Sequence, residues 1–236
     1  MIVRTQLLKD LVNIASAMKE QEITFVPDDT GMGVLITPPS HIEMMGIRIP
    51  ADRMEGYVPG NAFGLSADRL GKVLNTCGDT VEMEITDKMT VRSGRMRCTI
   101  PVMPPAEGGP RMPDLDGFTS ECVVSSDLVR TVSDAAPENA ASVRFILTEN
   151  GLVMSSTADD GVSAAEMDVP ADECVMCEGE ARATFAWVAW KAFLKGVPRG
   201  MDLDMRMADR YPLMVIFTTE NGLEGRWMLA PWIEEE

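Results

Sequence analysis

The stretch PVMPPAEGGP, residues 101–110, divides the chain into two halves that follow the same pattern. Four prolines and two glycines in ten residues exclude a helix or a central strand, and they are typical of a linker. Each half reads as a helix, a strand-turn-strand segment, a further strand, a second helix and a closing run of strands. The order occurs twice, which indicates an architecture built from two copies of one unit.

The strand-turn-strand segments are the clearest part of the repeat. In the first half, ITFV and GVLI flank the turn DDTG at residues 28–31, and in the second half VRFIL and LVM flank the turn ENG at residues 149–151. A chain of 236 residues can form two such domains of ordinary size. We therefore expect an α+β fold with similar domains at 1–100 and 118–236, joined by a connector at 101–117. The expected helices cover residues 4–19, 66–76, 125–135 and 185–200.

Composition excludes several classes of protein. Hydrophobic residues make up 45% of the chain, as in a folded soluble protein, and no apolar run approaches the ~18–20 residues of a membrane span. The first residues do not follow the pattern of a secretory signal peptide. We expect a cytoplasmic protein with no membrane partner.

The five cysteines are an odd number scattered through strand-like segments, which favours reduced thiols over a disulfide framework. Cys174 and Cys177 form the single C-x-x-C motif. A structural zinc site needs four ligands, and the chain has one histidine and no second C-x-x-C. A plain loop or strand-end pair is therefore favoured over a metal or redox site, and we expect no cofactor.

Charge is unevenly distributed along the chain. The formal net charge of −16 argues against a surface that binds nucleic acid over its whole area. The four expected helices have a net charge of +5, which leaves −21 for the remainder. Either this partition is chance among solvated side chains, or the helices form a basic face directed at a polyanion. The helical bases are Arg4, Lys9, Lys19, Arg69, Lys72, Arg130, Lys191, Lys195 and Arg199, and the acids are Asp10, Asp68, Asp127 and Asp134.

Catalytic motifs are weak. The Asp29-Thr30-Gly31 segment matches one half of an aspartic protease site, but the equivalent turn at 149–151 has no second aspartate. A hairpin turn is the favoured interpretation, and a two-lobed aspartic hydrolase built around Asp29 is the alternative. His41 is the only histidine, and no nucleophile elbow, phosphate loop or dinucleotide fingerprint accompanies it. We expect no enzyme.

Four phrases, in order and with matching spacing, carry a resemblance to a known family. They are PSHIEM at 39–44, GLSADRLGKVL at 64–74, YPL at 211–213 and LAPWIE at 229–234. Together they resemble the DNA sliding clamps of the archaeal and eukaryotic type, the proliferating cell nuclear antigen (PCNA) family. The resemblance implies a homotrimeric ring of six domains, with helices lining the hole and strands outside. It implies a processivity factor that encircles double-stranded DNA without sequence readout, and a subunit of a heterotrimeric ring is the alternative.

The resemblance also implies which residues face DNA. Lys9, Lys72 and Lys195 match lysines that the family directs into the hole. Helix placement adds Arg69, Arg130, Lys191 and Arg199. These side chains are expected to neutralise phosphates loosely, so that the ring can slide.

Apolar residues in the connector and the C-terminal segment predict a partner site. Trp227 and Leu229 fit equally well in a last edge strand folded onto the core. The family binds a short peptide, Gln-x-x-aliphatic-x-x-aromatic-aromatic, under the connector, and the users implied are DNA polymerase, the clamp loader, flap endonuclease and ligase. The matching positions are His41, Ile42, Met44, Met112, Leu115, Pro212, Met228, Leu229, Ala230 and Pro231.

Ring closure in the family pairs edge strands of neighbouring subunits. Here these strands correspond to residues 96–102 of one subunit and 163–169 of the next, and their pairing removes two exposed edges. Arg95 and Arg97 beside the first strand, with Glu166 and Asp168 on the second, provide opposite charges at this subunit interface.

Overall fold

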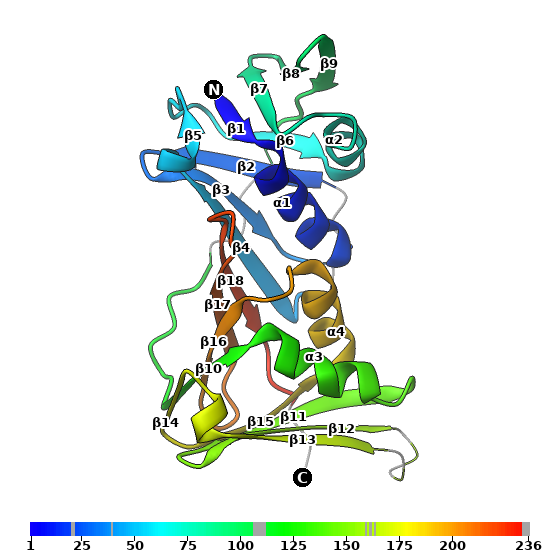
Figure 1. Ribbon diagram of the computed structural model, residues 1–236, viewed down its shortest axis with the longest axis vertical. Coiled ribbons are helices and arrows are strands. Elements are labelled where there is room, and N and C mark those ends of the chain that lie inside the picture. The colour runs from blue at the N-terminus through cyan, green and yellow to red at the C-terminus, as the bar shows by residue number, and fades with distance from the viewer. Residues whose placement is uncertain are drawn as a thin grey trace. The chain divides into compact units, whose positions relative to one another are not determined.

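The computed structural model describes residues 1–19, 22–38, 40–105, 112–158, 160, 162 and 164–232 (Figure 1). The chain forms two compact units. Unit 1 comprises Met1–Met112 and Thr218–Gly225, and unit 2 comprises Pro113–Phe217 and Arg226–Glu236. The boundary after Met112 falls within the expected connector. The short segment Thr218–Gly225 differs from the sequence-based division, because it belongs with unit 1.

Unit 1 begins with a strand and a helix, and its helices α1 and α2 pack against each other (Figure 1). Ser66 caps α2 by accepting a hydrogen bond from the Arg69 N–H. The elements are β1 (Ile2–Arg4), α1 (Thr5–Ala17), β2 (Glu22–Asp28), β3 (Gly31–Ile36), β4 (Glu43–Pro50), η1 (Ala51–Arg53), β5 (Met54–Glu55), β6 (Phe63–Ser66), α2 (Ala67–Leu74), β7 (Thr80–Ile85), β8 (Lys88–Ser93) and β9 (Met96–Pro101).

Unit 2 has the same kinds of element in the same order. Ser125 caps α3 by accepting a hydrogen bond from the Asp127 N–H. The elements are β10 (Ser120–Ser125), α3 (Ser126–Ala135), β11 (Ala140–Thr148), β12 (Gly151–Ala158), β13 (Ala164–Pro170), η2 (Ala171–Glu173), β14 (Met176–Glu178), β15 (Ala181–Ala186), α4 (Trp187–Gly196), β16 (Asp202–Met207), β17 (Leu213–Thr218) and β18 (Glu224–Leu229).

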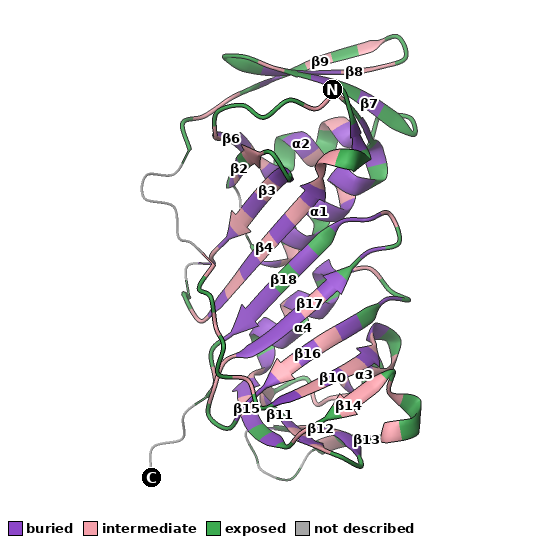
Figure 2. Ribbon diagram, turned by 90° about the vertical axis from the view of Figure 1, so that its left-hand side faces the viewer, coloured by how far each residue is buried: buried purple, intermediate pink, exposed green. Residues whose placement is uncertain are grey.

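Strand pairing repeats as well. In unit 1 the strand orders are β5-β1-β7-β8-β9 and β4-β3-β2-β6, and in unit 2 they are β14-β10-β16-β17-β18 and β13-β12-β11-β15. Each strand of the first unit therefore has a counterpart with the same neighbours in the second. Along β4, buried positions alternate with half-buried ones, as expected for a strand with one face on the core (Figure 2).

A glycine follows the turn of the equivalent hairpin in each unit. Gly31 opens β3 with φ of 147° and Gly151 opens β12 with φ of 136°. A Cβ atom on Gly31 would lie 2.2 Å from the Ile49 carbonyl oxygen, and one on Gly151 would lie 2.1 Å from the Val169 carbonyl oxygen. Only glycine fits both the backbone angle and the close approach of the next strand.

The cores form where the helices cover their sheets. In α1 the buried residues Leu7, Leu8, Leu11 and Ile14 follow helical spacing. The unit 2 core is aromatic, and Trp227 stacks on Phe193 with ring centroids 4.3 Å apart. Trp227 and Leu229 are fully buried, so β18 is a core strand and these two residues are not an exposed patch. Among the described residues, no helix combines the length and the apolar character of a membrane span.

The expected turn at DDTG is confirmed, and Asp28 holds it together. The Asp28 carboxylate accepts hydrogen bonds from the Thr30 N–H at 2.8 Å and the Gly31 N–H at 3.1 Å. Arg48 on β4 binds both carboxylate oxygens, at 2.7 and 3.0 Å. The hydrogen bond from the Thr30 hydroxyl, followed by the Thr30 N–H and Arg48, lowers the pKa of Asp28 from 3.8 to about 2.

This pKa shift predicts a pH-dependent contribution to stability. Because the folded pKa is lowered, the contribution is present above pH 3.8 and is lost as the pH falls toward about 2. The difference in urea midpoint between the wild type and Asp28→Asn should therefore shrink across this window. Asp29→Asn, which removes the neighbouring exposed charge, is the control and should show no such change. Equal pH profiles for the two variants would contradict the assignment.

Candidate DNA-facing helices and edge strands

The predicted DNA-facing bases lie mostly on exposed helix surface within each unit. Arg69 and Lys72 on α2, and Lys191 and Lys195 on α4, are exposed, and Lys9 on α1 is half-buried. Three bases of the expected helix ranges lie beyond the observed helix ends: Arg199, which was predicted to face DNA, and Arg4 and Lys19, which were not. Within those ends the helices contain six basic and four acidic residues, which is a net charge of +2. The expected helix ranges had a net charge of +5.

Two of these bases have acidic neighbours. Lys72 Nζ lies 2.7 Å from an Asp68 carboxylate oxygen one turn earlier on α2, and Arg199 lies 4.0 Å from Asp134. Both pairs are mostly exposed, so each contributes little stability and can be exchanged for a phosphate contact. The helices therefore offer a modest positive surface.

Arg130 differs from the prediction. It is only 9% exposed, and its Nη2 donates a hydrogen bond of 2.7 Å to the Val197 carbonyl oxygen at the end of α4. Burial and the charge of Arg199 lower the pKa of Arg130. Its Nε is buried with no partner among the described residues. Arg130 thus joins α3 to the end of α4, and we leave it out of the DNA-facing set.

The two expected seam strands both lie at sheet edges. β9 is the last strand of one sheet in unit 1, and β13 is the first strand of one sheet in unit 2. Residue 163, the first of the expected range, lies outside the described residues. Along both strands, exposed and half-buried positions alternate until a buried residue, Ile100 or Val169, near the end (Figure 2). Arg97, Glu166 and Asp168 are exposed on the strands, and Arg95 is exposed in the turn before β9.

At the charged residues of each edge strand, the backbone N–H groups point away from the sheet. A proline in a strand is tolerated where its missing N–H would face away from the neighbour, and Pro101 and Pro170 end β9 and β13. Alternate residues of an antiparallel strand direct their N–H groups to the same side. The backbone N–H of Arg97 therefore points to the same side as the Pro101 nitrogen, away from β8. The N–H groups of Glu166 and Asp168 likewise point to the side of the Pro170 nitrogen, away from β12. Both edges can add a strand.

The predicted peptide-binding residues are divided between the units. His41, Ile42, Met44 and Met112 belong to unit 1, and the remaining six belong to unit 2. Leu229 differs from the prediction, because it is fully buried in the unit 2 core, and Met228 is 5% exposed. The peptide-binding pocket remains a prediction, and Leu229 is no longer one of its residues. Of the others, His41 and Ala230 are exposed, and the half-buried members are Ile42, Met44, Met112, Leu115, Pro212 and Pro231.

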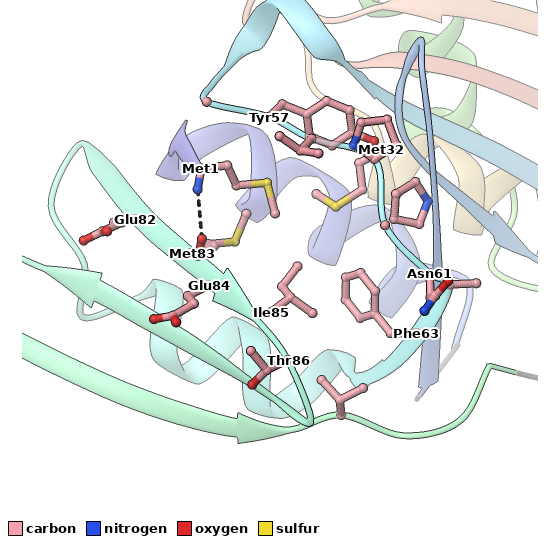
Figure 3. Close-up of a pocket in the computed structure, with 17 residues that line it drawn as sticks. Met1, Met32, Tyr57, Asn61, Phe63, Glu82, Met83, Glu84, Ile85 and Thr86 are labelled. Carbon is pink, nitrogen blue, oxygen red and sulfur yellow. Dashed lines mark hydrogen bonds between the residues drawn. The ribbon is translucent and has the colours of Figure 1, made fainter.

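A pocket of about 680 Å³ in unit 1 was not expected from the sequence. Figure 3 shows the side chains of Met32, Met83 and Phe63 gathered in it, while Glu82 and Glu84 are directed away from them. The backbone nitrogen of Met1 donates a hydrogen bond of 3.0 Å to the Met83 carbonyl oxygen. The described lining is methionine-rich and has no pair of acid and base arranged for catalysis.

The hydrolase alternative finds no support in the described residues. Asp29 is exposed in the β2–β3 turn, and the equivalent β11–β12 turn has Glu149 and Asn150. A shared-proton carboxylate pair needs two aspartates in contact. The turn has the structural role that its composition indicates.

The chain is similar to known proteins in both sequence and fold. No family model matches the chain. The DNA polymerase sliding clamp of Thermoplasma acidophilum is 25% identical, covering 97% of this chain and 96% of that protein. The DNA polymerase sliding clamp of Methanothrix thermoacetophila is 22% identical, covering 100% and 98%.

Solved structures of clamps have the same fold. The PCNA of A. fulgidus, bound to the C-terminal region of FEN-1, matches with a TM-score of 0.88 at 22% identity, covering 100% of this chain and 99% of that one. A PCNA2–PCNA3 complex from Sulfolobus tokodaii matches with a TM-score of 0.83 at 17% identity, covering 99% of each chain. These likenesses confirm the DNA-clamp fold.

The doubled unit, its repeated strand orders and the solved neighbours show that the chain has the two-domain DNA-clamp fold. Likeness to curated relatives along the whole chain supports a PCNA-type sliding clamp, as the sequence predicted.

Proposed function

We propose that three copies of this chain close into a ring around duplex DNA and tether DNA polymerase and other replication and repair enzymes. The observation that carries the ring is the pair of free edge strands, β9 in unit 1 and β13 in unit 2. One chain has both edges, so identical copies can join head to tail and close. The clamp acts by topology and makes or breaks no covalent bond.

Charge and apolar contacts both favour pairing of β9 with β13 of a second copy. Arg97 on one edge and Glu166 and Asp168 on the other have opposite charges. On the opposite face, Met96 and Met167 are only half-buried within their own units, and a neighbouring strand would cover them. The seam would bury these side chains and satisfy the outward N–H groups.

DNA would be held loosely in the ring. Lys9, Arg69, Lys72, Lys191, Lys195 and Arg199 provide phosphate contacts without base readout. The net charge of −16 repels DNA from the rest of the protein. Such a balance keeps the ring mobile along the duplex.

Partners would bind through short peptides at the predicted pocket. Its methionines suit a site that accepts several sequences. The A. fulgidus clamp was solved with the C-terminal region of FEN-1, which supports flap endonuclease as one user. DNA polymerase, the clamp loader and ligase are the others that we propose, in the cytoplasm at the nucleoid.

A mixed ring is the second candidate. The Sulfolobus tokodaii structure is a complex of PCNA2 with PCNA3, so a structural neighbour assembles from different chains. In a mixed ring the edges of this chain would pair with those of other chains.

The seam is tested by native mass spectrometry over a range of protein concentrations. Arg97→Glu and Glu166→Arg each place like charges across the seam, which should weaken it by about 1–2 kcal/mol, roughly tenfold in dissociation constant. The double reversal should restore the three-chain mass. Arg144→Glu, an exposed charge change on the interior strand β11, is the control.

Two outcomes would count against the proposal. A trimer that is insensitive to both single reversals would show that Arg97 and Glu166 do not meet. A single-chain mass at every concentration would contradict the homotrimer and favour the mixed ring.

A further inference from the structure

Three cysteines from separate segments meet at the β14 edge of a unit 2 sheet. Cys122 lies on β10, Cys174 directly follows η2, and Cys177 lies on β14. Their three sulfur atoms all lie within 4.8 Å of one another, and the Cys122 and Cys174 sulfurs are 3.7 Å apart. The C-x-x-C motif of the sequence therefore has a third thiol beside it.

We propose that Cys122, Cys174 and Cys177 form a binding site for one thiophilic d10 metal ion, Zn²⁺ or Cu⁺. Metal–sulfur bonds of about 2.3 Å place ligand sulfurs roughly 3.8–4.0 Å apart, close to the separation of Cys122 and Cys174. Among the described residues, no histidine or carboxylate joins the group. An all-sulfur donor set selects soft ions over Mg²⁺ or Ca²⁺. Zn²⁺ would take a water as its fourth ligand, whereas Cu⁺ is satisfied by three thiolates.

The backbone holds the three sulfurs before any ion arrives. Cys122 and Cys177 are directly paired across β10 and β14. Between the two C-x-x-C cysteines, the Val175 N–H donates a hydrogen bond of 2.8 Å to the Val123 carbonyl oxygen. The Cys174 N–H bonds to the Ala171 carbonyl oxygen at 3.3 Å, which closes the turn. Preorganised ligands lower the ordering cost of binding.

An ion can reach this site from solvent. Cys122 is fully buried, but Cys174 and Cys177 are half-buried, and Val175 between them is 72% exposed. One ligand is therefore fixed in the core while two lie at the surface. This arrangement provides both the entry path and the shielded side that a stable thiolate site needs.

The equivalent place in unit 1 has no thiol, so the fold itself does not require one. Counted from η1 and η2, Met54 and Tyr57 correspond to Cys174 and Cys177, and counted from α1 and α3, Met1 corresponds to Cys122. The hydroxyl of Tyr57 donates a hydrogen bond to the Asp28 carbonyl oxygen at 3.0 Å, and the Cys177 thiol donates one to the equivalent Thr148 carbonyl oxygen at 3.1 Å. Unit 2 thus keeps the local structure and has three thiols where unit 1 has two methionines and a tyrosine.

Deprotonation of the thiols is the cost that a bound ion must offset. Burial and the neighbouring thiols raise the pKa of Cys122, and burial together with Cys174 raises the pKa of Cys177. A thiolate at Cys122 or Cys177 is therefore disfavoured unless a positive charge compensates it. A bound ion would displace the thiol protons, so its affinity should rise with pH.

The test uses the full chain, purified with a reductant and stripped of metal with a chelator. Zn²⁺ alone or Cu⁺ alone is then added, and bound metal per chain and the thermal midpoint are measured. The wild type should bind one ion and gain thermal stability. Cys174→Ser and Cys177→Ser, which change half-buried positions, should bind at least about tenfold more weakly and gain nothing. Cys77→Ser, in unit 1 and outside the proposed seam strands, should behave as the wild type.

Separate measurements with Zn²⁺ and with Cu⁺ show which ion the site prefers. Tighter binding of Zn²⁺ or of Cu⁺ identifies the preferred one, and either result supports the site. Equal binding by the wild type and Cys174→Ser would overturn the proposal. Absence of binding, with a disulfide between Cys122 and Cys174 after exposure to oxygen, would also overturn it and would assign a redox pair instead. None of these readouts depends on ring formation.

Discussion

Replacement of Gly151 by alanine should lower the free energy of unfolding by about 3 kcal/mol or more. The new Cβ would lie 2.1 Å from the Val169 carbonyl oxygen and 3.0 Å from the Ala171 nitrogen, and both are backbone atoms that no side-chain rotation can move. The φ of 136° adds strain for any residue with a Cβ. Relief requires β13 to separate from β12, so the change should also damage the proposed seam edge.

The matched control is Gly200→Ala. Gly200 also has a positive φ, 73°, but nothing lies within 4 Å of its added Cβ. The Gly200→Ala variant therefore measures backbone strain alone, and it should lose about 1 kcal/mol of unfolding free energy. Gly31→Ala, at the equivalent hairpin of unit 1, should resemble Gly151→Ala. Urea unfolding of the three variants provides the measurement, and similar losses for Gly151→Ala and Gly200→Ala would show that the close approach is not the cause.

The repeat could be predicted from the sequence because its signals are local. Hairpin turns, apolar periodicity and the Pro/Gly stretch each involve neighbouring residues, and all three identified the two units. Helix ends were less accurate, since they depend on where the chain turns. α1 ends at Ala17, and Lys19 beyond it has φ of 61°, so it lies outside the helix.

Burial of individual side chains could not be predicted in this way. Arg130 was read as a surface base, but its partner, the Val197 carbonyl, is 67 residues away along the chain. Leu229 was placed at a binding surface, yet it belongs to the core. Thr218–Gly225 belongs to unit 1, where Asn221 donates a hydrogen bond of 3.3 Å to the buried carboxylate of Asp10. Long-range contacts of this kind leave no periodic signal.

The cysteine cluster was missed for the same reason. Cys174 and Cys177 form a visible motif, but Cys122 precedes Cys174 by 52 residues and joins it only through the pairing of β10 with β14. A count of C-x-x-C motifs cannot detect a ligand on a neighbouring strand. The equivalent positions of the two units would have drawn attention to it, because unit 1 has methionine and tyrosine there.

The second large effect concerns the retention of the protein on DNA by encirclement. A ring threaded onto linear duplex DNA should stay bound through a wash in about 1 M salt when both DNA ends are blocked by bulky groups. At that ionic strength the Debye length is about 3 Å, so phosphate contacts are largely screened and only topological linkage retains the protein. An open DNA end should release it within the same wash. Arg97→Glu, which is expected to weaken the proposed seam, should reduce retention on blocked DNA.

The measurement that tests the central claim most directly is the amount of protein left on end-blocked DNA before and after an endonuclease cuts the duplex. The account predicts retention in high salt before the cut and release after it. Equal loss from blocked and open DNA would contradict a closed ring, and retention that survives the cut would show that direct contacts, and not encirclement, hold the protein on DNA.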